Sequence, residues 1–98
     1  MMPQKIVGHP VICEEDEDDI RCYENRKVEI TGESISEVIR KVLKAYYDAD
    51  LIIFRVGSEC IGYYNPLKNT LNVRADFTNI VGDWKFDEVN SWWEPMDC

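Results

Sequence analysis

The sequence holds few of the residues on which catalysis and cofactor binding usually depend. Only one histidine, His9, is present, and it lies between Gly8 and Pro10. The glycine-rich phosphate loops, the nucleophile-elbow motif and the paired-histidine zinc motif are all missing. We therefore expect no enzyme, no catalytic residue, no cofactor and no metal.

Long apolar runs are also missing. The longest, residues 51–54, is far shorter than the roughly 20 residues that a membrane-spanning helix needs. Residues 1–10 show neither the apolar segment nor the small-residue cleavage site of a secretory signal. We expect a cytoplasmic protein that does not associate with a membrane.

Cysteines are few, and no two of them form a C-x-x-C unit. The four are Cys13, Cys22, Cys60 and Cys98. Free, partly buried thiols are the expectation, and three pairings exist if all four are oxidised. A zinc site would need His9, Cys13 and Cys22 plus Cys60 or Cys98, at gaps unlike those of compact zinc sites. His9 is expected at the surface, and its use as a base for Cys13 or Cys22 is the alternative.

Positive charge is scarce. The 98 residues include 11 Lys and Arg against 19 Asp and Glu, a formal net charge of −8 at pH 7. This balance disfavours direct binding to nucleic acid phosphates. The same field attracts a basic protein surface and speeds the encounter with it. An acidic surface that serves only solubility is the commoner alternative.

Apolar and aromatic side chains are abundant. They make up 45% and 11% of the chain, enough for one core, and we predict a single domain over residues 1–98. The clearest element is an amphipathic helix at about 34–47, because Ser34 and Glu37 form a capping box at its start. Its apolar positions recur at steps of three and four.

Strands are expected on both sides of this helix. Residues 5–13 favour an edge strand or an irregular arm, because Gly8 and Pro10 interrupt them, and residues 27–31 favour a short strand. Turn residues at 57–58 and 65–69 predict a three-strand meander over about 51–75. The predicted fold class is α+β, with the helix packed on a mainly antiparallel sheet. A short C-terminal helix capped by Asp87, or an extended form, would complete it.

Two segments are candidate binding surfaces. The first is an unbroken run of six carboxylates, expected as a solvated acidic loop at about 14–19. The second is the acidic and aromatic C-terminal quarter, where only one of the adjacent tryptophans can face a core. The predicted partner-binding residues are Glu14, Glu15, Asp16, Glu17, Asp18, Asp19, Asp87, Glu88, Trp92 and Trp93.

These features predict a non-enzymatic acidic binding protein. Carboxylates at phosphate-like density would present to a basic groove a field like that of a nucleic acid, provided that the two acidic segments share a face. Small acidic inhibitors from phages and other mobile elements have this size and charge. An inhibitor of a nucleic-acid-handling or defence protein is therefore the leading hypothesis. The alternative is a homodimeric structural or ligand-binding domain that pairs through an exposed strand of the meander.

Overall fold

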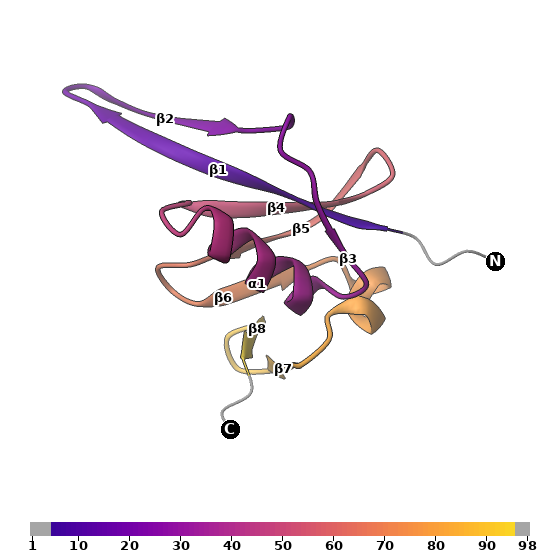
Figure 1. The fold of residues 1–98 in the computed structure, drawn as a ribbon. Helices are drawn as coiled ribbons and strands as arrows, with labels where there is room; N and C mark the ends of the chain where they lie inside the picture. The colour runs from indigo at the N-terminus through magenta and orange to yellow at the C-terminus, as the bar shows by residue number, and fades with distance from the viewer. Residues whose placement is uncertain (1–4, 96–98) are drawn as a thin grey trace.

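The structure, a computed structural model, describes residues 5–95. These residues form one eight-stranded antiparallel sheet, one α-helix and one 3-10 helix, which is a mixed α+β arrangement (Figure 1). The elements are β1 (Ile6–Asp16), β2 (Asp19–Glu24), β3 (Ile30–Gly32), α1 (Ile35–Ala45), β4 (Leu51–Val56), β5 (Glu59–Asn65), β6 (Thr70–Val73), η1 (Ala75–Ile80), β7 (Trp84–Asp87) and β8 (Trp92–Pro95). The strand order is β2-β1-β4-β5-β6-β8-β7, and β3 pairs with β1.

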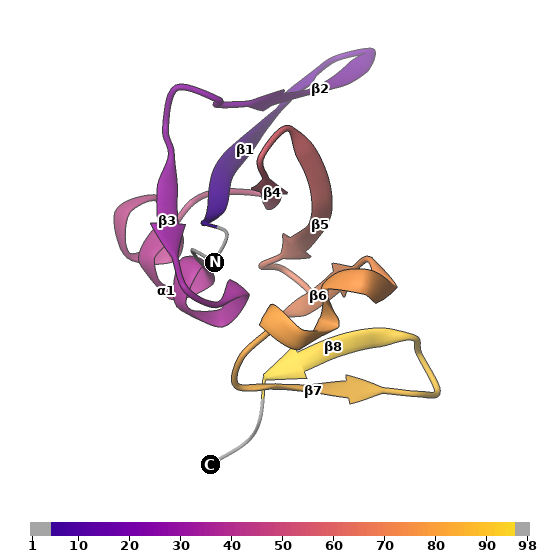
Figure 2. The same cartoon turned by 90° about the vertical axis from the view of Figure 1, so that its right-hand side faces the viewer.

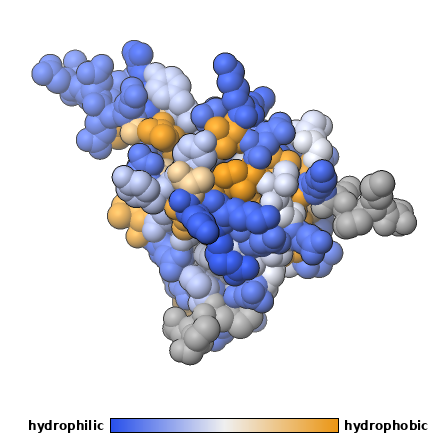
Figure 3. All heavy atoms as spheres, in the orientation of Figure 1, coloured by the Kyte–Doolittle hydropathy of each residue, from blue (hydrophilic) through white to orange (hydrophobic). Residues whose placement is uncertain are grey.

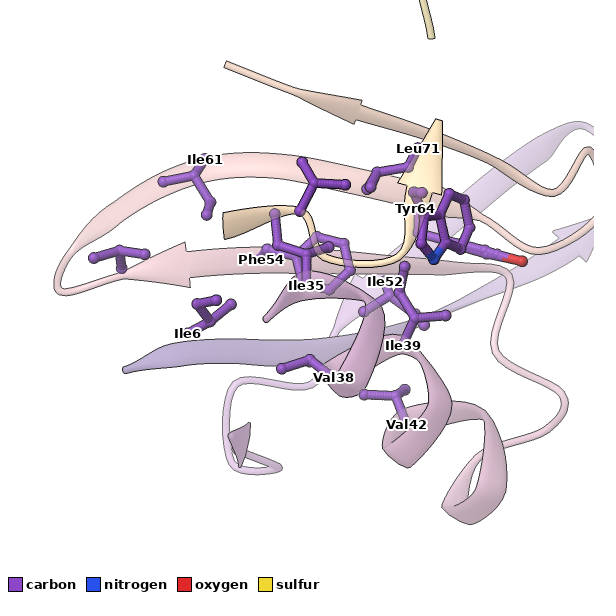
Figure 4. Close-up of a cluster of buried hydrophobic side chains, with 13 residues drawn as sticks. Ile6, Ile35, Val38, Ile39, Val42, Ile52, Phe54, Ile61, Tyr64 and Leu71 are labelled. Carbon is purple, nitrogen blue, oxygen red and sulfur yellow. The ribbon is translucent and has the colours of Figure 1, made fainter. Parts of the chain in front are cut away.

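Helix α1 begins where the capping box predicts. The hydroxyl of Ser34 accepts a hydrogen bond of 3.2 Å from the backbone N–H of Glu37, and the Glu37 carboxylate accepts one of 3.0 Å from the N–H of Glu33. The apolar side of the helix meets one face of the sheet in a single buried cluster (Figure 4). This cluster includes Ile6, Ile35, Val38, Ile39, Val42, Ile52, Phe54, Ile61, Tyr64 and Leu71. Within residues 5–95 we find no helix with the length and apolarity to cross a membrane.

The predicted meander over 51–75 is present as β4, β5 and β6. Gly57 begins the turn between β4 and β5 with a φ of 64°, a backbone conformation that favours glycine. The strand predicted at 27–31 is shorter and lies later, at Ile30–Gly32.

Strand β1 lies inside the sheet, which corrects the prediction of an edge strand or irregular arm. It pairs with β4 on one side and with β3 and β2 in turn on the other. The carbonyl of Pro10 accepts a hydrogen bond of 2.9 Å from Asn25, in the gap between the end of β2 and the start of β3. In an antiparallel strand the N–H and the carbonyl of one residue face the same side. The N–H that Pro10 lacks would therefore face this gap too. Proline is tolerated here because no described strand pairs with Pro10 on that side of β1.

Gly8 also has a reason to lie within β1. A Cβ atom there would lie 2.5 Å from Cγ1 of Val38 and 3.3 Å from Cγ2 of Val42. Both valines are fully buried and have little room to move. The missing side chain at Gly8 therefore allows α1 to pack closely on β1.

The predicted C-terminal helix is wrong, because this segment forms the β7–β8 hairpin. The Asp87 carboxylate does cap backbone groups, but those groups belong to a turn. Its Oδ1 accepts hydrogen bonds from the N–H groups of Val89 at 2.9 Å and Asn90 at 3.2 Å. Ser91, with a φ of 61°, completes the reversal of the chain. The predicted extended alternative is the form that the structure adopts.

We expect Gly8→Ala to lower the free energy of unfolding by about 1–3 kcal/mol, because the added methyl group overpacks the contact with α1. Urea denaturation measures this change. Gly57→Asn is the matched control, because a Cβ at Gly57 meets nothing within 4 Å and Asn tolerates positive φ. A Gly8→Ala variant as stable as the control would contradict the close packing.

Candidate functional site

The acidic run belongs to a β-hairpin, which corrects the prediction of a loop. β1 continues to Asp16 and β2 begins at Asp19, with the turn at residues 17–18. β4 pairs with β1 only as far as Val11. Residues 12–23, here called the acidic hairpin, therefore extend beyond the sheet as a two-stranded ribbon (Figures 1 and 2).

A disulfide closes this hairpin. Cys13 and Cys22 are directly opposite each other on β1 and β2 and are bonded. The prediction of free thiols is wrong for these two residues, whereas Cys60 is free and exposed. Cys98 lies outside the described residues. The spacing of the two cysteines indicates this pairing, although the sequence analysis did not predict it. Three residues separate each of them from the turn at 17–18. Two cysteines placed symmetrically about a tight turn occupy opposing positions of a hairpin.

The base of the acidic hairpin is attached to the sheet from both of its strands. On β1, the N–H of Cys13 donates to Oδ2 of Asp50 at 2.6 Å, and the N–H of Asp50 donates to the carbonyl of Val11 at 2.8 Å. On β2, the Glu24 carboxylate accepts two hydrogen bonds from the Arg55 guanidinium, at 3.0 and 3.1 Å. These hydrogen bonds lower the pKa of Glu24 and raise that of Arg55.

The six carboxylates of residues 14–19, here called the acidic tip, have no cationic partner in the part of the chain that the structure describes. All six residues are exposed. Asp16 and Asp19 accept hydrogen bonds from the following backbone N–H groups, at 3.3 and 3.0 Å. Hydrophilic side chains surround the outer end of the projecting hairpin in Figure 3 (upper left). The negative charge of the tip therefore faces solvent.

Neither the tip nor any other described segment gathers metal ligands. No group of three or more His, Cys, Asp or Glu side chains within residues 5–95 is placed to hold a metal ion. A hairpin turn directs adjacent carboxylates apart, whereas a calcium site needs its oxygen ligands around one point. The arrangement is suited to contact with an extended positive surface.

The second predicted acidic segment lies at the opposite edge of the sheet. Asp87 and Glu88 are at the β7–β8 turn, and β7 and β2 are the two ends of the strand order (Figure 2). The structure therefore does not bring the two acidic segments together, so the condition that they share a face is not met, and any likeness to a nucleic acid rests on the acidic tip alone. Hydrogen bonds from the side chain and backbone of Asn90 lower the pKa of Asp87, so this carboxylate serves the turn.

The adjacent tryptophans differ in their surroundings, as alternation along a strand requires. Trp93 packs against the core, and its ring centroid lies 5.3 Å from that of Phe86. Trp92 lies outside the buried cluster, and its indole N–H donates to Glu94 at 2.9 Å. Trp93 therefore contributes to the packing of the fold, and neither indole lies beside the acidic tip.

His9 is buried, with 5% of its surface exposed, which corrects the prediction of a surface histidine. Its Nδ1 donates to the carbonyl of Val28 at 2.9 Å, because the connection from β2 to β3 passes beside strand β1. The thiols of Cys13 and Cys22 are consumed in the disulfide. A catalytic pair of His9 with either cysteine therefore lacks its nucleophile in this state.

Comparison of the chain with protein-family models, curated proteins and solved structures finds no match. A function has to be inferred from the acidic hairpin and the surfaces around it.

We expect the double variant Cys13→Ser, Cys22→Ser to lose order in the acidic hairpin while the remaining sheet stays folded. Closing a loop of this length is worth about 2–3 kcal/mol in the chain-entropy description, and an isolated two-stranded ribbon is marginal in water. Amide hydrogen exchange should show protection lost in residues 12–23 and kept in β4 and β5. Cys60→Ser is the control, and unchanged protection in the double variant would show that the bridge is dispensable.

Glu24→Gln should lower the free energy of unfolding by about 1 kcal/mol at pH 7, because it removes a charged hydrogen-bonded pair that solvent partly screens. The lowered pKa of Glu24 means that this contribution is fully present above the usual pKa of glutamate, 4.5, and is lost as the pH falls through the lowered pKa of the folded state. Urea unfolding of both proteins at pH 7 and pH 3 should therefore show a larger difference at pH 7 than at pH 3. An equal difference at both values would contradict an ionic origin. The exposed Glu29→Gln is the control.

Proposed function

We propose that this chain is a non-enzymatic binding protein whose acidic hairpin occupies a basic surface of another protein. The observation that supports this function is the set of six exposed, unpaired carboxylates on a disulfide-closed ribbon beyond the sheet. A flexible acidic tail loses conformational entropy when it binds. A closed hairpin has less to lose, so more of its electrostatic attraction appears as affinity.

The density of charge favours a partner that handles nucleic acid. A strand rises about 3.3 Å per residue, so the acidic tip spans about 10 Å and carries about one negative charge per 2 Å. Duplex DNA carries about one charge per 1.7 Å of its axis. Arg21, opposite Glu14, is the one cation within residues 12–23. The tip can therefore replace a short stretch of nucleic acid in a basic groove, and the activity proposed is inhibition of a nucleic-acid-handling or defence enzyme, of the phage or mobile-element type.

The alternative of a homodimer has less support than the sequence suggested. β4, β5 and β6 each have a neighbour on both sides, so no strand of the meander is an edge. Of the edge strands, β2 carries part of the acidic tip. Two copies pairing through β2 would bring like charges close together, which is unfavourable.

The cytoplasmic location stays a prediction. Disulfides are typical of oxidising compartments and are transient in most cytosolic proteins. The bond between Cys13 and Cys22 therefore favours either an oxidising compartment or a hairpin that a cellular dithiol can open.

Two variants of equal net charge test this function. The tip variant carries Glu15→Gln, Glu17→Gln and Asp18→Asn, which leaves the two capping aspartates in place. The control variant removes three exposed carboxylates elsewhere that form no ion pair among residues 5–95, through Glu29→Gln, Glu33→Gln and Glu88→Gln. Each variant lowers the negative charge by three, so only the position of the lost charge differs.

We expect immobilised wild type and control to retain the same basic protein from a host lysate at low salt, and the tip variant to lose it. With that partner purified, the association rate constant of the tip variant should fall on the order of tenfold and depend less on salt. The partner should also release its nucleic acid when the wild-type chain is added. Equal retention by both variants would contradict the assignment.

A further inference from the structure

A shallow cavity of about 490 Å³ lies at the foot of the acidic hairpin, where β1 leaves the sheet. Three segments that are distant in sequence form it. They are the disulfide-bonded Cys13 of β1, the connection from α1 to β4, and the turn from β5 to β6. We call this cavity the foot groove, and the lining residues that matter here are Tyr47, Asp48, Asp50 and Leu67.

The foot groove has an apolar rim. Tyr47 is 85% exposed and Leu67 is 93% exposed, although both are large apolar side chains. A single exposed apolar residue needs no explanation. Here two of them line one cavity, together with Leu51 and Pro66, next to the segment that carries the proposed function. An exposed apolar surface with a polar border, next to a charged element, is a candidate contact site.

The same groove also carries unpaired negative charge. Asp48 and Asp50 line it, and neither takes part in an ion pair among residues 5–95. Oδ2 of Asp50 accepts the N–H of Cys13, which leaves its other carboxylate oxygen for a ligand. A cationic group in the groove would thus meet two carboxylates besides those of the acidic tip.

The backbone of β1 on this side is open beyond the sheet. Asp50 bonds to the carbonyl of Val11 and the N–H of Cys13, so alternate residues of β1 present their polar groups toward β4. Glu15 is the next residue in that series, and β4 does not extend far enough to reach it. Within residues 5–95, no strand therefore pairs with residues 14–16 on this side.

From these observations we propose that the foot groove receives an extended segment of the basic partner, in which Lys or Arg adjoins an aliphatic side chain. The cation contacts Asp48 and Asp50, and the aliphatic group covers Tyr47 and Leu67. The inference rests on the proposed function and assigns the two steps of binding to two surfaces. Charge on the tip accelerates the encounter, and burial in the groove slows dissociation.

Two synthetic dodecapeptides of equal charge serve as probes. In one, Lys alternates with Leu, and in the other, Lys alternates with Ser. We expect wild type to bind the Lys–Leu peptide on the order of tenfold more tightly, through slower dissociation. The variant Tyr47→Ser, Leu67→Ser should bind both peptides equally, with the affinity that wild type has for the Lys–Ser peptide. Both substitutions are at exposed positions and should leave the fold intact.

Val89→Ser is the matched control. Val89 is 91% exposed and lies in the β7–β8 turn, so this variant should keep the full preference for the Lys–Leu peptide. A preference that survives in the Tyr47→Ser, Leu67→Ser variant would overturn the groove assignment, and so would a wild type without preference.

The tip variant separates this failure from failure of the proposed function. If it binds both peptides more weakly while the groove variant shows no change, the electrostatic function stands and the groove assignment is wrong. If the tip variant binds both peptides as wild type does, the electrostatic function is wrong, whatever the groove variant shows.

Discussion

Strand β1 is longer than the strand beside it, and the placement of the acidic charge depends on this mismatch. β4 accompanies β1 as far as Val11, but β1 continues to Asp16. A two-stranded ribbon outside a sheet is marginal in water, and this one places Asp16 opposite Asp19, where like charges repel. The disulfide between Cys13 and Cys22 joins the strands just beyond the supported part of β1. It offsets the repulsion that the tip brings.

Two sets of carboxylates among the described residues differ in what they contact. Glu24, Glu37, Asp50 and Asp87 accept hydrogen bonds that hold a strand, a helix start or a turn in place. The side chains of the acidic tip contribute little to the fold, because among the described residues only those of Asp16 and Asp19 accept hydrogen bonds, each from the N–H of the next residue. The acidic tip carries unpaired charge on a hairpin that a disulfide holds in place. This combination favours binding, rather than solubility, as the role of the tip. The C-terminal acidic segment lacks this feature, since Asp87 is used within its own turn.

The sequence predicted what local patterns determine and missed what distant contacts determine. The capping box at Ser34 and the helical period predicted α1, and the turn residues predicted the meander. Gly8 and Pro10 looked like interruptions, because their roles depend on the approach of α1 and on the gap between β2 and β3. Asp87 can cap a helix or a turn, and only the strand pairing of Trp93 with Leu71 decides between them. Tyr47 and Leu67 lie twenty residues apart, and no local pattern connects them.

The most direct test of a binding acidic hairpin is a two-dimensional NMR titration of the oxidised, full-length chain with dodecalysine. Chemical-shift changes show which residues the cationic peptide contacts, and exposed carboxylates lie at both edges of the sheet. We predict the largest changes in residues 14–19, smaller ones at Asp48 and Asp50, and none in the β7–β8 hairpin, with all changes reduced by added salt. Changes centred on Asp87 and Glu88, or spread evenly over every exposed carboxylate, would contradict the role assigned to the hairpin.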